Sequence, residues 1–224
     1  MTGNGGDPGS FLDAIDDSDR SALFSFARRR RYPKGDSLFN EGNRSDRVLI
    51  LLEGRAKVAR ATEEGKEVLL ALRGPGDLLG EMSAFDGEPH SASATALEDC
   101  DALVITRDEF TSFLEEHPRA AVTLLTMLTQ RLRDADEKRV DFLAYDAESR
   151  VARRLVELAE RFGEATDAGV RIGVLSQEEL GGWLGASRES VSKALQTMRS
   201  RGWIETHRRE ITVVDLDALR QRAE

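Results

Sequence analysis

Apolar and polar positions repeat with different periods along this chain, and the changes of period divide it into segments. From about residue 28 to residue 106, short apolar runs alternate with glycine-rich breaks. Runs of that length at regular spacing are typical of antiparallel strands in a barrel or jelly roll. The expected strands are Ser37–Asn40, Val48–Leu52, Ala56–Ala61 and Glu67–Leu72.

A long helix is predicted from Pro118 to about Ala144, a stretch without glycine and without a further proline. Its apolar residues recur at alternating spacings of four and three, which is a heptad pattern. The stripe consists of Ala121, Leu125, Leu128, Leu132, Ala135 and Phe142, with a charged break at Arg139. A single stripe could pack only on its own domain, but this helix is long and Leu124, Met127 and Leu143 flank the stripe. We therefore predict a parallel two-fold homodimer.

A helix-turn-helix is predicted near the carboxyl end, after a hinge at residues 146–149 and a helix from about Ala147 to Phe162. Ser176 and Glu179 have the spacing of a capping box, so a helix should begin there. Gly185 should end this helix, and Ser187 is placed to cap the next one. The two helices would then be joined by a tight turn.

The second of these helices is expected to be amphipathic. Val191, Ala194, Leu195 and Met198 recur at spacings of three and four, which predicts a buried stripe. Arg188, Glu189, Ser192 and Lys193 fall on the other side. Such a face is often only solvated, but here the caps and the tight turn occur with it. We expect Arg188, Glu189 and Lys193 to read base edges in the major groove of DNA.

Trp203 to Val214 alternates like a two-stranded hairpin with a basic tip, which would add a wing to the helix-turn-helix. From Arg188 to Arg209 the chain holds six basic side chains against two acidic ones. Polar groups in this region are expected to contact DNA phosphates, which position a protein without reading sequence. The predicted phosphate contacts are Ser176, Gln177, Ser187, Ser190, His207 and Arg209.

Composition adds limits to this interpretation. The formal net charge is -9, and it arises wholly before residue 147, so a specific DNA-binding domain fits better than a non-specific nucleic-acid coat. A single cysteine, Cys100, excludes an intramolecular disulfide and is expected to be a buried small residue. No segment has the pattern of a signal peptide or a membrane span. We expect a cytoplasmic protein whose residues 1–9 are disordered.

Two further segments carry a family resemblance. Leu38 to Gly54 resembles the first signature of cyclic-nucleotide-binding domains, and Leu79 to Phe85 with Ser91 to Ala96 is similar to their phosphate-binding cassette. With the winged helix downstream, the chain resembles the CRP/FNR family of bacterial transcription regulators. The fold class expected is α+β, with an N-terminal antiparallel jelly roll, a long dimerisation helix and a C-terminal winged helix-turn-helix. The expected domains are residues 10–116, 117–146 and 147–224.

The resemblance implies an effector pocket around the cassette. Its backbone N–H groups near Ser83 would hold a phosphate, and Glu81 would accept a hydrogen bond from a ribose hydroxyl. The arginine that the family uses to bind the phosphate is absent, and His90 stands there. The positions that contact the base carry Ala135 and Asp136. The candidate pocket residues are Gly80, Glu81, Met82, Ser83, His90, Ser91, Ala92, Ala135 and Asp136.

Three possibilities for the effector remain open: a vestigial pocket, a different small molecule, or weakened cyclic-AMP binding in which His90 replaces the arginine. The resemblance also implies a TGTGA-like half-site and RNA polymerase as a partner. An enzyme is not expected, because the three histidines lie far apart and form no metal-binding or catalytic motif. A regulatory subunit that uses its winged helix for protein contacts is a lesser alternative.

Overall fold

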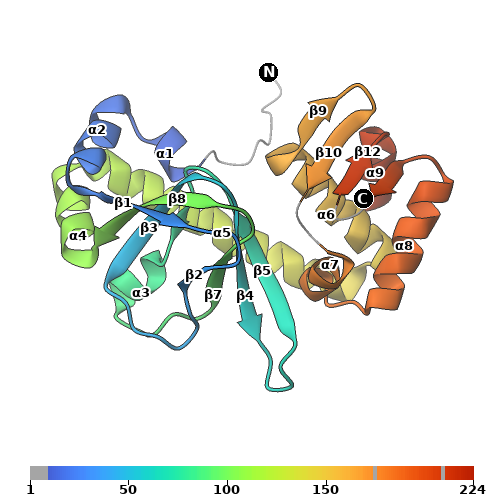
Figure 1. Ribbon diagram of the computed structural model, residues 1–224, viewed down its shortest axis with the longest axis horizontal. Coiled ribbons are helices and arrows are strands. Elements are labelled where there is room, and N and C mark those ends of the chain that lie inside the picture. Colours follow the sequence, from blue (N-terminus) through green and yellow to red (C-terminus); the bar gives the residue numbers. More distant parts are fainter. Residues whose placement is uncertain (1–9, 174–175, 208–209) are drawn as a thin grey trace. The chain divides into compact units, whose positions relative to one another are not determined.

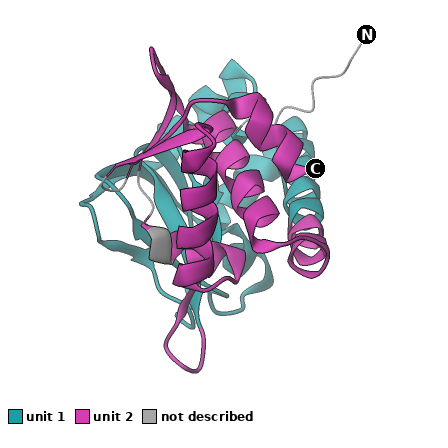
Figure 2. Cartoon of the chain, turned by 90° about the vertical axis from the view of Figure 1, so that its right-hand side faces the viewer, with its two compact units in different colours: residues 1–61, 70–134 teal, residues 62–69, 135–224 magenta. Residues whose placement is uncertain are grey.

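The computed structural model describes residues 10–173, 176–207 and 210–224, which form two compact units. The first unit holds the residues up to 61 and residues 70–134, and the second holds residues 62–69 and 135–224 (Figure 2). Residues 1–9, for which the sequence predicts disorder, lie outside the described residues. No helix in the described part of the chain is long and apolar enough to cross a membrane.

Two four-stranded antiparallel sheets dominate the amino-terminal half (Figure 1). Leu49 and Leu51 of one sheet and Ala94 and Ala96 of the other belong to a single buried cluster, so the sheets pack face to face. This arrangement confirms the predicted β-rich, antiparallel domain. One sheet has the order β1 (Arg28–Tyr32), β8 (Cys100–Thr106), β3 (Arg47–Glu53) and β6 (Leu78–Leu79), and the other β2 (Ser37–Phe39), β7 (Ser93–Ala96), β4 (Ala56–Ala61) and β5 (Glu67–Arg73).

Cys100, at the start of β8, is buried as expected. Burial is the main cause that raises the pKa of its thiol to about 11, so the thiol is protonated and unreactive at neutral pH.

Short helices complete the first unit around a second apolar cluster. Phe11, Leu23 and Phe110 are fully buried in this cluster together with Val48 and Ile50 of β3. The helices are α1 (Phe11–Ala14), α2 (Asp17–Phe26), α3 (Glu81–Asp86) and α4 (Arg107–Glu116). Of these helices, α3 lies directly between two strands, β6 and β7, and Ala84 of α3 belongs to the buried cluster.

The long helix α5 (Pro118–Ala144) has the predicted bounds. Leu124 and Met127, which were expected to flank the dimer stripe, instead pack into the apolar cluster of the first unit. By contrast Leu125 and Leu132 are 64% and 63% exposed. The helix therefore has one apolar face that is buried within its own unit and another that is open.

The second unit is a winged helix-turn-helix built on α6 (Ala147–Phe162). Val151, Leu155 and Leu158 are buried along one side of it. Asp146 is the N-cap of α6, because its carboxylate accepts a hydrogen bond from the Ser149 N–H. The hinge role expected for residues 146–149 stays a prediction. The other helices are α7 (Gln177–Leu184), α8 (Arg188–Ser200) and α9 (Leu216–Ala223).

A small antiparallel sheet completes this unit, with the order β11-β12-β10-β9. Ile204 pairs with Val213 and His207 pairs with Glu210, which gives the predicted wing hairpin between β11 and β12. The strands are β9 (Glu164–Thr166), β10 (Gly169–Gly173), β11 (Ile204–His207) and β12 (Glu210–Val213).

Candidate nucleic-acid interface and effector pocket

The turn between α7 and α8 has the geometry that its residues predict. The Ser176 side chain accepts a hydrogen bond from the Glu179 N–H, and the Glu179 carboxylate accepts one from the Ser176 N–H. Gly185 ends α7 in the left-handed region at φ +58°, where a side chain would be strained. Ser187 then caps α8 by accepting a hydrogen bond from the Ser190 N–H. These local contacts fix where the second helix begins.

Helix α8 presents its charged residues to solvent. Val191, Ala194, Leu195 and Met198 are buried on the opposite face, as predicted. Arg188, Glu189 and Lys193 are exposed, and among the described residues none of these three side chains forms an ion pair. Two of them lie in the first turn. Their hydrogen-bonding groups are therefore available to a ligand, in the half of the helix that enters a groove in helix-turn-helix proteins.

The predicted phosphate contacts have mixed surroundings. Ser187 is exposed, and its hydroxyl lies 3.0 Å from the Ser190 hydroxyl. Ser176 is half-buried because its side chain serves the cap of α7. His207 is exposed on β11, with Nε2 3.9 Å from the Glu205 carboxylate. The side chain of Gln177 and the whole of Arg209 lie outside the described residues, so their proposed contacts stay predictions.

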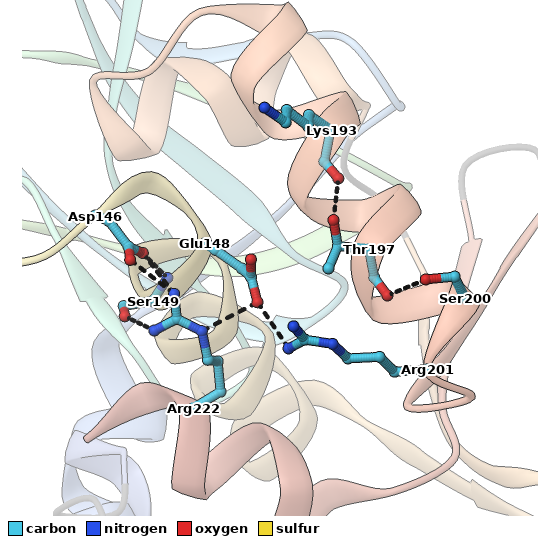
Figure 3. Close-up of polar contacts among 8 residues, drawn as sticks. All are labelled: Asp146, Glu148, Ser149, Lys193, Thr197, Ser200, Arg201 and Arg222. Carbon is cyan, nitrogen blue, oxygen red and sulfur yellow. Dashed lines mark hydrogen bonds and ion pairs between the residues drawn. The ribbon is translucent and has the colours of Figure 1, made fainter.

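An arginine cluster joins the end of α8 to the start of α6 (Figure 3). Arg201 donates to the Glu148 carboxylate over 3.1 Å, and Arg222 of α9 donates to the same carboxylate over 3.0 Å. Arg222 also donates to both oxygens of Asp146, at 2.9 and 2.7 Å, and to the Ser149 hydroxyl. Arg201 is one of the six basic residues between Arg188 and Arg209, but it forms an ion pair with Glu148 of the same chain.

In the first unit, the cassette residues surround a carboxylate that already has a partner. Gly80 precedes α3 with φ +80°, and Glu81 is buried at the first position of that helix. Arg131 of α5 donates to Glu81 Oε1 over 2.6 Å and to the Leu78 carbonyl over 3.0 Å. One oxygen of the carboxylate that the resemblance assigns to a ribose hydroxyl, Oε1, is thus bonded to a guanidinium of the same unit.

His90 is packed among the cassette residues and is only 4% exposed. Its Nδ1 lies 2.9 Å from the Ser83 hydroxyl, and its ring stacks on Phe39 with centroids 4.1 Å apart. Its Nε2 is buried, with no hydrogen-bond partner among the described residues. An unpaired buried polar atom of this kind costs about 1–3 kcal/mol. Burial lowers the pKa of His90 below its ordinary 6.5, against an opposing effect of the Glu81 charge.

The remaining cassette residues lie around this centre with different exposure. Met82 and Ser91 are exposed, whereas Ala92 is buried. Ala135 and Asp136 are exposed residues of the part of α5 that belongs to the second unit, and the Asp136 carboxylate pairs with Arg139 over 3.0 Å. The contacts expected between these two residues and a base therefore stay predictions.

Sequence reasoning missed three residues that shape these sites: Phe39, Arg131 and Arg222. Phe39 is one of many strand residues, and Arg131 is one of several arginines on α5. Each acts on a residue about fifty or more positions away, so no local spacing reveals it. The double sheet brings Phe39 to His90, and the packing of α5 brings Arg131 to Glu81.

These groups can be tested against a cyclic nucleotide, which carries one permanent negative charge on its phosphodiester. Arg131 is already committed to Glu81, and burial favours the neutral form of His90. At the place where the resemblance puts the phosphate, the described residues therefore offer a ring nitrogen that can form a hydrogen bond, and neither group there is a permanently charged cation free of a partner. No cluster of metal-binding side chains occurs in the described part of the chain.

Comparisons with known proteins identify two domains in this chain. Residues 29–117 match the model of a cyclic nucleotide-binding domain, and residues 149–222 match a Crp-like helix-turn-helix domain. A CRP-like cAMP-activated global transcriptional regulator of Mycobacterium tuberculosis is 37% identical over 86% of each chain. The cyclic AMP receptor protein of Thermus thermophilus is 35% identical over 80% of each. FixK2 of Bradyrhizobium japonicum shares the fold, with a TM-score of 0.78, 22% identity and coverage of 88% of this chain and 98% of that one.

Proposed function

Because the chain belongs to the CRP/FNR family of transcription regulators, we propose that it binds DNA as a homodimer at a palindrome with TGTGA-like half-sites. Its relatives are regulators and not enzymes, so the activity to explain is binding. We further propose that cyclic AMP controls this binding weakly or not at all. The domain boundaries proposed are those expected from the sequence, at residues 116 and 146.

One observation carries the proposal for DNA. Arg188, Glu189 and Lys193 are exposed on a helix whose opposite face is buried and whose start is fixed by a serine cap. Arginine and lysine can donate to guanine, and glutamate can accept from the amino group of cytosine. A helix that served only as a protein contact has no need of this donor and acceptor set. The set therefore favours base reading over a regulatory subunit that binds another protein.

The effector part of the proposal rests on His90 and Arg131. Replacement of a phosphate-binding arginine by a neutral histidine removes a charge-assisted hydrogen bond worth about 1.5–3 kcal/mol, or roughly 10- to 150-fold in affinity. Arg131 does not supply the missing charge, because it pairs with Glu81. Another small-molecule effector is the alternative. By family relationship we also propose a cytoplasmic location and RNA polymerase as a partner.

The proposal is tested by fluorescence anisotropy with a labelled TGTGA palindrome and a scrambled duplex, each with and without cyclic AMP. We expect tight binding to the palindrome, and less than a tenfold change with the nucleotide at neutral pH. Arg188→Ala should cost roughly 1–3 kcal/mol on the palindrome and relax preference at one base pair, because a bidentate contact to guanine is lost.

Arg199→Ala is the matched control, since Arg199 is an exposed arginine in the last turn of the same helix. It should weaken binding to both duplexes to a similar extent and leave the sequence preference intact. Equal affinity of the Arg188→Ala and wild-type proteins for the palindrome would rule out the proposed reading face. A strong cyclic-AMP requirement at neutral pH would rule out the proposed loss of effector control.

A further inference from the structure

The ring of His90 has one hydrogen-bonding position left. Ser83 occupies Nδ1, Phe39 covers one face, and Nε2 is buried without a partner among the described residues. The backbone of His90 is fixed as well, since its N–H donates to the Asn43 carbonyl and its carbonyl accepts from the Gly42 N–H. A buried polar atom in a well-packed site calls for a missing partner, and a ligand of the matched cyclic nucleotide-binding domain would supply one.

The charged groups around the ring come from several elements. On α3, Glu81 is the acidic neighbour, and Arg131 of α5 neutralises it at 2.6 Å. Asp77, in the loop before β6, lies 3.9 Å from Arg131. From β2 the ring meets the uncharged Phe39, and from β3 the Arg47 carbonyl lies beside Gly80. The Arg47 side chain lies 3.8 Å from Asp46, so it is paired within its own segment.

Because these neighbouring charges are paired with one another, the imidazole of His90 is the one group in the cassette that can gain a positive charge near neutral pH. Resting on the proposed function, we propose that His90 is the anion-recognising residue of this pocket and holds the phosphodiester of a cyclic nucleotide only in its protonated form. Binding of the nucleotide is then coupled to the uptake of a proton, and a fall in pH strengthens it.

The sign of the effect follows from linkage. In the free protein burial holds the pKa of His90 below 6.5, so the ring is mostly neutral at pH 7. A bound phosphodiester favours the charged form and raises the pKa in the complex. Between those two pKa values each binding event takes up a proton, and affinity rises by up to about tenfold for each unit that the pH falls. Below the pKa of the free protein the gain levels off.

The test is calorimetric titration of the full-length protein with cyclic AMP between about pH 5.5 and pH 8, in buffers with different ionisation enthalpies. The wild type is expected to bind more tightly as the pH falls, with proton uptake that approaches one per nucleotide. His90→Arg has a permanent charge, so it should bind more tightly at pH 8 and show neither effect. His90→Gln stays neutral, so it should remain weak and gain nothing in acid.

Affinity that does not change with pH, without proton uptake by the wild type, overturns the inference, and so does the absence of binding at every pH. If His90→Arg does not fold, the proton uptake of the wild type and the affinity of His90→Gln for cyclic AMP still test the inference. Binding to the TGTGA palindrome without nucleotide is measured on the same preparations. DNA binding without linked protonation keeps the proposed function and removes this inference. Linked protonation without DNA binding does the reverse.

Discussion

Ser187 combines two roles that can be separated by substitution. Its hydroxyl accepts the Ser190 N–H over 3.2 Å and caps α8, and it is also a proposed phosphate contact. Ser187→Ala removes the cap, so we expect the free energy of unfolding to fall by about 1 kcal/mol. Ser187→Asp keeps a good cap and adds a negative charge at the helix start, so stability should stay near the wild-type value.

The aspartate variant, which should keep its stability, should be impaired in its affinity for DNA. Ser187→Asp places a negative charge where a phosphate is proposed to lie, so affinity for DNA should drop at unchanged stability. Urea unfolding and anisotropy titrations measure the two properties. If the aspartate variant bound DNA as tightly as the wild type, Ser187 would not lie near the DNA backbone.

Contacts between residues three apart were predictable from the sequence, because a capping serine and its partner share one turn of helix. The capping box at Ser176 and the cap at Ser187 are of this kind. The contacts of His90 with Phe39 and of Glu81 with Arg131 join residues 51 and 50 positions apart. Their geometry depends on how the sheets and α5 pack, and a single sequence does not contain that information locally.

At the scale of elements, strong periodicity predicted helix bounds well. Helix α5 and helix α6 have the expected bounds, because proline or an aspartate cap begins each of them. Strand β9 was not predicted, since its three residues are all exposed and show no alternation. Ser149, at the end of the proposed hinge, is buried in the first turn of α6, and the hinge role of residues 146–149 stays a prediction.

Helix α9 also went unpredicted, and the structure gives it a specific role. It carries Arg222 to the start of α6, where the guanidinium meets both Asp146 and Glu148 (Figure 3). Arg222→Gln removes these charge-assisted contacts. We expect the unfolding free energy of the second unit to fall by about 1 kcal/mol, a value that allows for solvent screening of the partly exposed Asp146.

The effect of this substitution should depend on pH. The Ser149 N–H and then Arg222 hold the pKa of Asp146 below its ordinary 3.8. A lowered carboxylate pKa means that the contact stabilises the fold fully above that ordinary value and loses its effect as the pH falls through the lower one. Differential scanning calorimetry should therefore show that the wild type is more stable than Arg222→Gln at pH 7, and that this difference in stability becomes smaller in strong acid. Arg220→Gln is the control, because it breaks an exposed ion pair between α9 and Glu160 of α6, and it should lower the unfolding free energy by less.

At the scale of the whole molecule, one face of α5 is buried and another is exposed, and this difference bears on how the protein assembles. Ala120, Leu124 and Met127 belong to the core of the first unit, so they are not available to a partner. Val122, Leu125 and Leu132 lie on another face of the same helix and are largely exposed. An exposed apolar stripe at heptad spacing on a helix of 27 residues is typical of a helix that pairs with its own copy.

A palindromic DNA site makes this pairing testable, because only a two-fold dimer can engage both half-sites at once. Leu125→Glu combined with Leu132→Glu places charges in the stripe. We expect sedimentation analysis to show a dimer for the wild type and a monomer for this variant. Affinity for the palindrome should fall toward that for a single half-site, since the second contact is no longer intramolecular.

Thr126→Glu is the control, because it adds one glutamate at an exposed position about 100° round the helix from Leu125. It should remain a dimer and keep its preference for the palindrome over a single half-site. Far-ultraviolet circular dichroism of all three proteins separates loss of pairing from loss of folding. A folded double variant that still sediments as a dimer would show that this stripe is not the interface, and the symmetry of the DNA site would then need another explanation.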